Sequence, residues 1–280
     1  MAGVTVITVT FNAAQVLEGC LASVAAQEGV EVEHLVIDGG STDGTLDVLR
    51  NWTRHPLVWV SEPDRGISHA FSKGLARATG DPIGILNADD RYAPGALARA
   101  VAALEAHPEA GFTFGHCLHR ESDGRTWLNR GNPRYFERMR FFMPDVNHPT
   151  MVVRRSAYDR VGGFEERWRL AMDYDWLARA EAIGVRGVLV NEIQAEMAMG
   201  GASDRAWWRA YAEARDIAIA HGAPAGLAWM DHLGRLAKSG LRRGLVALGA
   251  TSVERAIRLR RQRRILGGNA FDRAHDPRSS

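Results

Sequence analysis

The sequence predicts an α/β protein: a mixed, mainly parallel sheet flanked by helices, followed by a helical C-terminal extension. Three observations predict this. Apolar, β-branched segments alternate with segments of helical spacing over the first 90 residues. Polar residues directly follow these apolar segments, as expected where strands deliver side chains to the carboxyl edge of an open sheet. From residue 202 the pattern turns helical.

Composition sets the outer limits. The 280 residues are 46% hydrophobic and 24% charged, which is typical of a globular protein. Two cysteines, Cys20 and Cys117, provide no disulfide framework, so we expect a reducing, cytoplasmic setting. No basic segment precedes the first apolar stretch and no run of 18 apolar residues occurs, so neither a secretory signal nor a spanning helix is predicted.

The charge is unevenly distributed. Residues 235–264 contain ten Lys or Arg against one acid, a local charge of +9. Since the whole chain carries +2, the remainder carries 2 − 9 = −7. The sequence therefore predicts a mildly acidic body and a basic C-terminal part.

Four strand and helix units open the chain. We expect strands at 4–10, 34–37, 57–60 and from 83, and helices at 15–26, after 45, and at 67–78. This alternation implies parallel strands joined by right-handed crossovers. Further along, we expect a helix at 96–106, strands at 112–118 and 151–153, and an irregular loop at 120–140.

The segment 83–90, Ile-Gly-Ile-Leu-Asn-Ala-Asp-Asp, is the central candidate for a functional site. It predicts a buried strand that ends on Asp89 and Asp90. Paired carboxylates at a strand end suit a hard divalent cation, which takes oxygen ligands and often keeps substrate phosphates in its shell. A solvated acidic turn is the alternative that this segment alone leaves open.

The turn that starts at Asp38 also has two interpretations. Ser41 or Thr42 could cap the following helix, because short side-chain oxygens accept the free N–H groups of a first helical turn. Alternatively, an acid beside a glycine-rich helix entry could hold the base and phosphates of a nucleotide. Neither GxGxxG nor GxxxxGK[ST] is present, so no dinucleotide site or P-loop is supported.

Five ordered motifs over about 85 residues resemble family 2 inverting glycosyltransferases, which have the GT-A fold. The matching segments are Thr8–Asn12, Val36–Thr45, Ser61–Ile67 with Lys73-Gly74, Ala78–Asp81 and Leu86–Asp90. The resemblance implies a UDP-, GDP- or dTDP-sugar donor, Mg²⁺ or Mn²⁺, and a glycan or lipid-linked acceptor.

The resemblance also implies roles for individual residues. Asp38 would accept a hydrogen bond from the base, and Asp89, with Asp90 beside it, would bind the metal. The expected donor contacts are Thr10, Asn12, Asp38, Asp64, Arg65, Lys73, Asn87, Ala88 and Asp89. Asn87 stands where many relatives carry an acid, so either the metal is held more weakly or Asn87 bonds the ribose. Ser68, His69 and Ser72 also depart from the common pattern.

The acceptor half of the resemblance places the catalytic base at Asp173. Met172 replaces the usual Glu before it, and Asp175 is the alternative base. His148 and Trp176 are expected on the acceptor side. We expect a catalytic domain at 1–200, with a nucleotide-sugar half at 1–110 and an acceptor half at 111–200, and a helical basic extension at 201–280.

The extension interleaves Trp and Leu with Arg and Lys. Such helices lie at membrane interfaces and favour anionic lipid, although a basic face packed on the catalytic domain fits equally well. No nucleic-acid-binding fold precedes the Arg-rich stretch, so no nucleic acid partner is predicted. We expect peripheral attachment to the inner face of the cytoplasmic membrane.

The leading hypothesis is an inverting glycosyltransferase of cell-surface polysaccharide or glycolipid assembly, a metal-dependent hexosyltransferase. A nucleotidyltransferase is a rival, but it normally has a Gly-rich basic loop after the first strand, and residues 10–14 lack one. A non-catalytic sugar-nucleotide-binding or membrane-scaffold protein is the other alternative, favoured by Asn87 and Met172.

Overall fold

The computed structural model describes residues 3–121, 123–139, 143–201 and 205–247. Residue contacts divide the chain into two compact units, residues 1–228 and residues from 229 onward. Each unit is described by itself. Part of the predicted extension, residues 201–228, therefore groups with the catalytic unit, and the basic residues from 255 to 264 lie outside the described residues.

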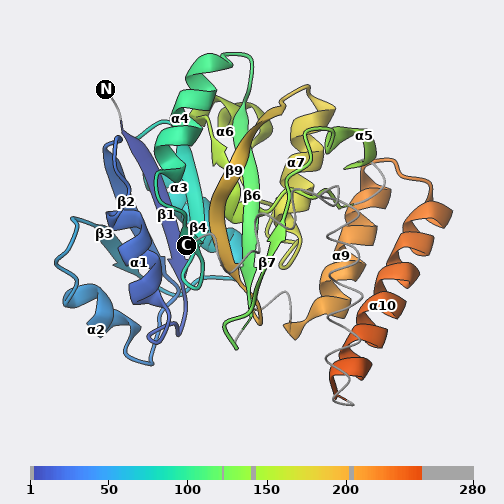
Figure 1. The fold of residues 1–280 in the computed structure, drawn as a ribbon, viewed down its shortest axis with the longest axis horizontal. Helices are drawn as coiled ribbons and strands as arrows, with labels where there is room; N and C mark the ends of the chain where they lie inside the picture. The colour runs from blue at the N-terminus through green and yellow to red at the C-terminus, as the bar shows by residue number, and fades with distance from the viewer. Residues whose placement is uncertain (1–2, 122, 140–142, 202–204, 248–280) are drawn as a thin grey trace, which may run out of the picture. The chain divides into compact units, whose positions relative to one another are not determined.

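A mixed sheet of nine strands forms the centre of the first unit (Figure 1). The strand order is β3-β2-β1-β4-β8-β6-β9-β5, with β7 paired to β6. The pairs β3-β2, β2-β1, β1-β4 and β6-β9 are parallel. The strands are β1 Val4–Thr10, β2 Val32–Asp38, β3 Val58–Ser61, β4 Ile83–Asn87, β5 Arg91–Tyr92, β6 Phe112–Arg120, β7 Thr126–Asn129, β8 Val152–Val153 and β9 Gly187–Ala198.

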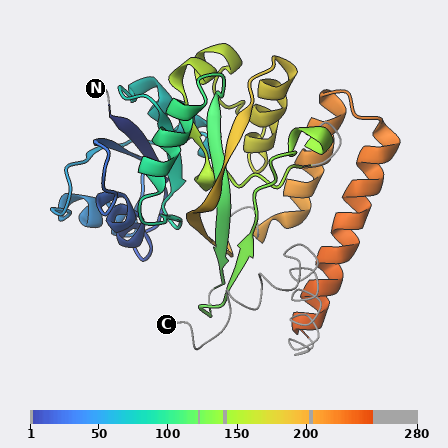
Figure 2. The same ribbon diagram turned by 45° about the horizontal axis from the view of Figure 1, so that its top comes forward.

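Helices cover both faces of this sheet, as Figures 1 and 2 show. The helices among the described residues are α1 Leu17–Ala25, α2 Thr45–Arg50, α3 Ile67–Arg77, α4 Ala96–Ala106, α5 Phe136–Met139, α6 Arg155–Val161, α7 Met172–Ala182, α9 Trp207–Ala220 and α10 Ala225–Ala247, with a 3₁₀ turn at His148–Thr150; most of α10 belongs to the second unit. The predicted α/β class with C-terminal helices is confirmed.

Strand β1 explains why two layers of helices are needed. Its side chains alternate, so Val4 and Val6 belong to a core cluster with residues of α1 and α4, whereas Ile7 and Val9 belong to the cluster on the other face, which includes residues of α3, α6 and α7. All seven residues of β1 are buried. Each fully buried Val or Ile contributes about 1.5–3 kcal/mol. A strand that is apolar on both faces therefore requires cover on both sides, as parallel sheets generally do.

The expected elements differ from the structure in two places. The predicted loop at 120–140 contains β7 and α5. Strand β9 was not predicted, although it has 12 residues and lies between β6 and β5. Most of its residues are half-buried or exposed, and apolar and polar residues do not alternate cleanly along it. The period-2 signal that predicts a half-buried strand is therefore weak.

In the second unit, the described residues form the C-terminal part of α10. Large apolar side chains on it are exposed, namely Trp229, Met230, Leu233 and Leu241. No described helix combines the length and the apolar character needed to cross a bilayer. This segment is therefore amphipathic, with basic residues at positions 235, 238 and 243 between the apolar ones.

Candidate active site

The carboxyl ends of three parallel strands meet at one edge of the sheet. In the register of β1, β2 and β3, Thr10 lies opposite Asp38 and Asp38 lies opposite Ser61. On the other side of β1, Val9 lies opposite Asn87 of β4. The sequence-predicted donor residues from these strands therefore share one edge, as expected for an open α/β sheet.

Asp38 organises the turn after β2. Its Oδ2 accepts hydrogen bonds from the backbone N–H of Gly40 at 3.0 Å, from that of Ser41 at 2.9 Å and from Ser61 Oγ at 2.6 Å. Ser41 Oγ donates to Oδ1. The side chain is 0% exposed and its oxygens are engaged within the turn, and its contact with the nucleobase stays a prediction. Asp38 shapes the loop that borders the site.

A second set of bonds ties this turn to the end of β1. Ser41 Oγ accepts from the Asn12 N–H at 2.7 Å, and Asn12 Oδ1 accepts from the Thr42 N–H at 2.9 Å. Asn12 has φ +50°, a conformation that Asn tolerates better than most residues. Neither Ser41 nor Thr42 caps α2, because the N-cap position is Gly44. Asn12 therefore holds two loops together at the strand ends.

Gly39 allows a close approach between this turn and the loop after β3. A Cβ at residue 39 would lie 2.5 Å from Asp64 Oδ2 and 3.4 Å from the ring of Phe11. The Phe11 side chain is 63% exposed, which is unusual for a ring at the end of a buried strand. Phe11 lies within the Thr8–Asn12 motif, where no role was predicted for it. The sequence signal that could have singled it out is an aromatic residue directly after an apolar strand.

The two expected basic donor contacts are already engaged. Arg65 forms a bidentate pair with Glu166, at 2.7 Å from Nε and 2.6 Å from Nη2. Lys73 Nζ donates to the Pro63 carbonyl at 2.9 Å and lies 3.2 Å from Glu62 Oε1. Lys73 thus fixes the loop after β3 from the adjoining helix α3.

Asp89 and Asp90 follow β4 in different environments. Asp90 is 1% exposed, and its oxygens accept from the Ala198 N–H at 3.0 Å and from Asn87 Nδ2 at 3.2 Å. Burial and the neighbouring Asp89 charge raise the pKa of Asp90 to about 8. Asp89 is half-buried, and burial raises its pKa while Arg205 and Arg120 oppose the rise. Strand β9 thus holds Asp90, and Asp89 faces outward.

These residues fit a divalent cation in part. Among the described side chains, no group of three or more His, Cys, Asp and Glu forms a cluster that could hold a metal. However, Asn87 Oδ1 is buried without a hydrogen-bond partner, and no side chain in the described chain donates to Asp89. A cation of the Mg²⁺ type commonly uses one or two carboxylates and completes its shell with substrate phosphates. Asp89 and Asn87 Oδ1 meet that smaller requirement, and Asp90, which was also expected at the metal, bonds the Ala198 N–H and Asn87 Nδ2.

Asp173 lies in the first turn of α7. Its Oδ1 accepts from the Tyr174 N–H at 2.8 Å. Burial raises the pKa of Asp173 to about 6, and the charge of Glu213 adds to this rise. A carboxylate whose pKa lies near neutral pH suits general base catalysis. The pKa of Asp173 is therefore raised even though Met, and not Glu, stands at position 172.

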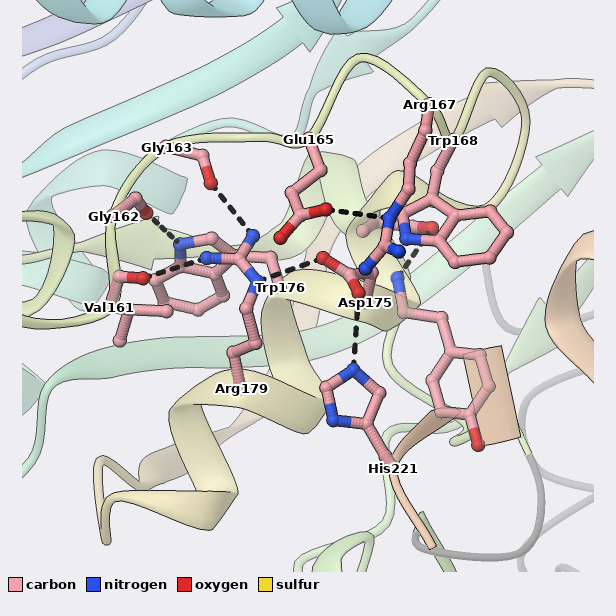
Figure 3. A network of polar contacts seen from close by, with 12 residues as sticks. Val161, Gly162, Gly163, Glu165, Arg167, Trp168, Asp175, Trp176, Arg179 and His221 are labelled. Atoms are coloured by element: carbon pink, nitrogen blue, oxygen red, sulfur yellow. Dashed lines mark hydrogen bonds and ion pairs between the residues drawn. The ribbon is translucent and has the colours of Figure 1, made fainter. Parts of the chain in front are cut away.

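Asp175 has other partners than Asp173, and Figure 3 shows its bonds to Arg179 and His221. It is 0% exposed, and its oxygens bond Arg179 Nε at 2.8 Å and His221 Nε2 at 3.1 Å. Arg179 also donates to the carbonyls of Val161 and Gly163, both at 2.7 Å. Since both oxygens have partners inside the protein, Asp175 supports the loop after α6, and these bonds favour Asp173 over Asp175 as the base.

The two residues expected on the acceptor side pack within the protein. Trp176 is 1% exposed, donates to the Gly162 carbonyl at 3.0 Å and packs against Tyr158, and its role on the acceptor side stays a prediction. His148 is half-buried and stacks on Phe71 with ring centroids 5.1 Å apart. Burial lowers the pKa of His148 to about 4, which keeps the ring neutral.

Two contacts join the loop before α7 to the donor edge. One is the Arg65–Glu166 pair, and the other is a hydrogen bond from Ser68 Oγ to the Trp168 carbonyl at 2.7 Å. Residues 65 and 68 follow β3, at the carboxyl edge of the sheet. The loop that leads to Asp173 therefore borders the same edge as the Asp38 turn.

Comparison with known proteins identifies the family. Residues 5–162 match the family described as Glycosyl transferase family 2, and this match covers more than half of the chain. The chain belongs to this family and is a glycosyltransferase with a GT-A fold, as the motif series predicted.

Relatives and solved structures support this membership. A PGL/p-HBAD biosynthesis glycosyltransferase of Mycobacterium tuberculosis is 31% identical over 179 residues, which cover 62% of this chain and 68% of that protein. The mannosyltransferase PcManGT from Pyrobaculum calidifontis, solved with GDP-Man and Mn²⁺, is 25% identical with a TM-score of 0.61, covering 90% of this chain and 80% of that one.

Staphylococcus aureus TarS shares the fold. Its 1–349 form in complex with UDP-GlcNAc is 17% identical with a TM-score of 0.57, covering 83% of this chain and 72% of that one. A longer TarS chain is 20% identical with a TM-score of 0.55, over 83% of this chain. The present chain spans 43% of the length of that longer chain.

Proposed function

We propose that this glycosyltransferase moves a sugar, with inversion, from a nucleoside-diphosphate donor to a glycan or lipid-linked acceptor. The observation that carries this is the common edge at which the Asp38 turn, Asp89 and the loop to Asp173 meet. Relatives with UDP-GlcNAc and GDP-Man support the donor class, and the mycobacterial relative in PGL/p-HBAD biosynthesis supports a glycolipid acceptor.

The reaction is a single displacement. The acceptor oxygen bonds the anomeric carbon as the bond from that carbon to the diphosphate oxygen breaks, and the electron pair leaves with the diphosphate. The acceptor proton goes to a carboxylate oxygen of Asp173. A base placed within hydrogen-bond reach contributes about 10²–10⁴-fold. Its pKa of about 6 leaves Asp173 mostly ionised at pH 7, ready to accept that proton.

Asp89 would hold Mg²⁺ or Mn²⁺, with Asn87 Oδ1 and Asp90 beside it. When bound, such an ion acts as a Lewis acid on the diphosphate oxygens. Asp90 is fixed by the Ala198 N–H, and it keeps Asn87 oriented through the bond from Asn87 Nδ2. The turn that follows β4 would therefore present Asp89 to the donor and keep Asp90 as a support for Asn87.

Phe11 would bind the nucleobase. An exposed aromatic ring at the end of a buried strand offers a flat surface for stacking, which is worth about 0.5–1.5 kcal/mol beyond area burial. Asn12 fixes the backbone next to the ring through its bonds to Ser41 and Thr42, and Gly39 leaves room beside the ring because it has no Cβ.

Donor turnover tests the proposal directly. We expect release of UDP from UDP-GlcNAc or of GDP from GDP-mannose, dependent on Mn²⁺ and lost in Asp173→Asn and Asp89→Asn. Donor binding to Asp173→Asn, measured as a thermal shift, should remain. Near-full turnover in Asp173→Asn would show the base assignment to be wrong, whereas donor binding without turnover in the unmodified protein would indicate a non-catalytic relative.

The second unit would attach the enzyme to the inner face of the cytoplasmic membrane. Its exposed Trp229, Met230 and Leu233 supply the apolar side chains, and basic residues of α10 supply attraction to anionic lipid. We expect the full chain to sediment with phosphatidylglycerol vesicles and not with neutral phosphatidylcholine vesicles. Met230→Glu should reduce this binding, whereas Val58→Glu, at an exposed position of β3, should not.

A further inference from the structure

The start of α7 is capped by a side chain from a distant helix. Glu213 of α9 accepts hydrogen bonds from three consecutive backbone N–H groups, those of Arg169 at 3.1 Å, Leu170 at 2.8 Å and Ala171 at 3.0 Å, all to Oε2. The N-cap residue Ala171 makes no side-chain capping bond of its own. Backbone N–H groups at the start of a helix lack partners within the helix and favour a negative charge. Glu213, which belongs to α9, supplies both the hydrogen-bond acceptor and the charge.

Other bonds fix the same segment from two further sides. Ser68 Oγ holds the Trp168 carbonyl from α3, at 2.7 Å. Tyr174 donates its hydroxyl to the Met139 carbonyl at 2.7 Å. Residues 168–174 are therefore held by three separate elements, and Asp173 lies within this segment. A shift of its backbone by about 1 Å would cost up to about 10²-fold in rate.

Glu213 also supplies a carboxylate near Asp173. Position 172, where related sequences carry Glu, is Met in this chain. The charge of Glu213 raises the pKa of Asp173 in addition to the larger effect of burial. A residue about 40 positions later in the sequence thus provides the second negative charge that the adjacent position lacks.

The other ionisable groups around the start of α7 have different partners. Arg179 and His221 pair with Asp175 on the buried side of α7. In the loop before α7, Arg167 pairs with Glu165 and the Arg169 side chain is exposed. On α6, Arg160 donates to the Ile183 carbonyl, and the Tyr158 hydroxyl is buried. On α9, Arg215 contacts Asp216.

We propose that Glu213 is a positioning residue for Asp173, holding the backbone at 169–171 and placing a second negative charge beside the base. The inference rests on the proposed role of Asp173. It predicts that the charge and the length of the residue at 213 matter in separate ways. Glu213→Gln keeps an oxygen that can accept the N–H bonds and removes the charge, whereas Glu213→Asp keeps the charge and shortens the reach.

The test is the pH dependence of nucleoside diphosphate release from UDP-GlcNAc or GDP-mannose with Mn²⁺. In Glu213→Gln we expect the acid limb of the profile to move to lower pH, because Asp173 loses a neighbouring negative charge. In Glu213→Asp we expect an unmoved acid limb and a kcat lower by about tenfold, with donor KM within about twofold of the unmodified protein. Asp216→Asn, on the same helix, should change neither.

Each result has a distinct meaning. An acid limb in Glu213→Gln that coincides with that of the unmodified protein would overturn the electrostatic part, and an unchanged kcat in Glu213→Asp would overturn the positioning part. If Glu213→Gln does not fold, Glu213→Asp and the Asp216→Asn control still decide the positioning part. Full activity of Asp173→Asn would instead overturn the proposed base, which separates that failure from the failure of this inference.

Discussion

Replacing Asp175 by Asn separates the structural acid of α7 from the catalytic one. The substitution weakens two charge-assisted contacts of a fully buried carboxylate, to Arg179 at 2.8 Å and to His221 at 3.1 Å. Charged hydrogen bonds contribute about 1.5–3 kcal/mol each, and Asn can still accept one of them. Arg179 is partly exposed, so water recovers some of its loss. We expect unfolding to become easier by about 3 kcal/mol.

For a unit of 228 residues, that loss lowers Tm by about 6–12 °C. Thermal unfolding monitored by fluorescence measures it, with Asp216→Asn as a control at a carboxylate whose side chain is 48% exposed and which should shift Tm by at most a few degrees. Asp173→Asn should do the reverse, losing turnover without a comparable loss of Tm. The reasoning is refuted if Asp175→Asn melts with the unmodified protein while turnover disappears, because Asp175 would then act in the chemistry.

Three further outcomes follow from the site. Turnover should rise with pH, reach half of its plateau near pH 6 and level off above about 7, because Asp173 accepts a proton only when ionised. At pH 5 the rate should be about one tenth of the plateau, and a flat profile between 5 and 7 would contradict this. Gly39→Ala should raise the donor KM about tenfold with little change in kcat, because its Cβ would lie 2.5 Å from Asp64 Oδ2. Asn87→Asp should lower Tm in the absence of metal, because a third carboxylate beside Asp89 and Asp90 adds repulsion, and Mn²⁺ should restore Tm. If Mn²⁺ leaves the Tm of this variant unchanged, the metal site is wrong.

The sequence predicted the donor half well because its signals are local. Strand β1 has a continuous apolar, β-branched pattern, and helices α3 and α4 have helical spacing bounded by Gly and Pro. In the structure these elements begin and end close to the predicted positions. The polar residues that end β1, β2 and β4 meet at one edge because parallel strands all point the same way.

The acceptor half was predicted less well because its contacts are remote in sequence. Strand β9 pairs with β6 across about 75 residues, and its Ala198 N–H fixes Asp90 from more than 100 residues away. Trp176 and Asp175 carry no sequence mark that distinguishes a buried side chain from one facing an acceptor. Their roles depend on which face of α7 packs against α6 and α9.

By itself, the sequence determined the fold class, the motif series and the strand ends, because backbone propensity and apolar periodicity act between near neighbours. Only the tertiary structure decided which acids are available. Burial and hydrogen bonds engage Asp38, Asp90 and Asp175 inside the protein and leave Asp89 and Asp173 as the candidates for chemistry. A carboxylate becomes structural or reactive through the donors folded around it, and those donors come from distant parts of the chain.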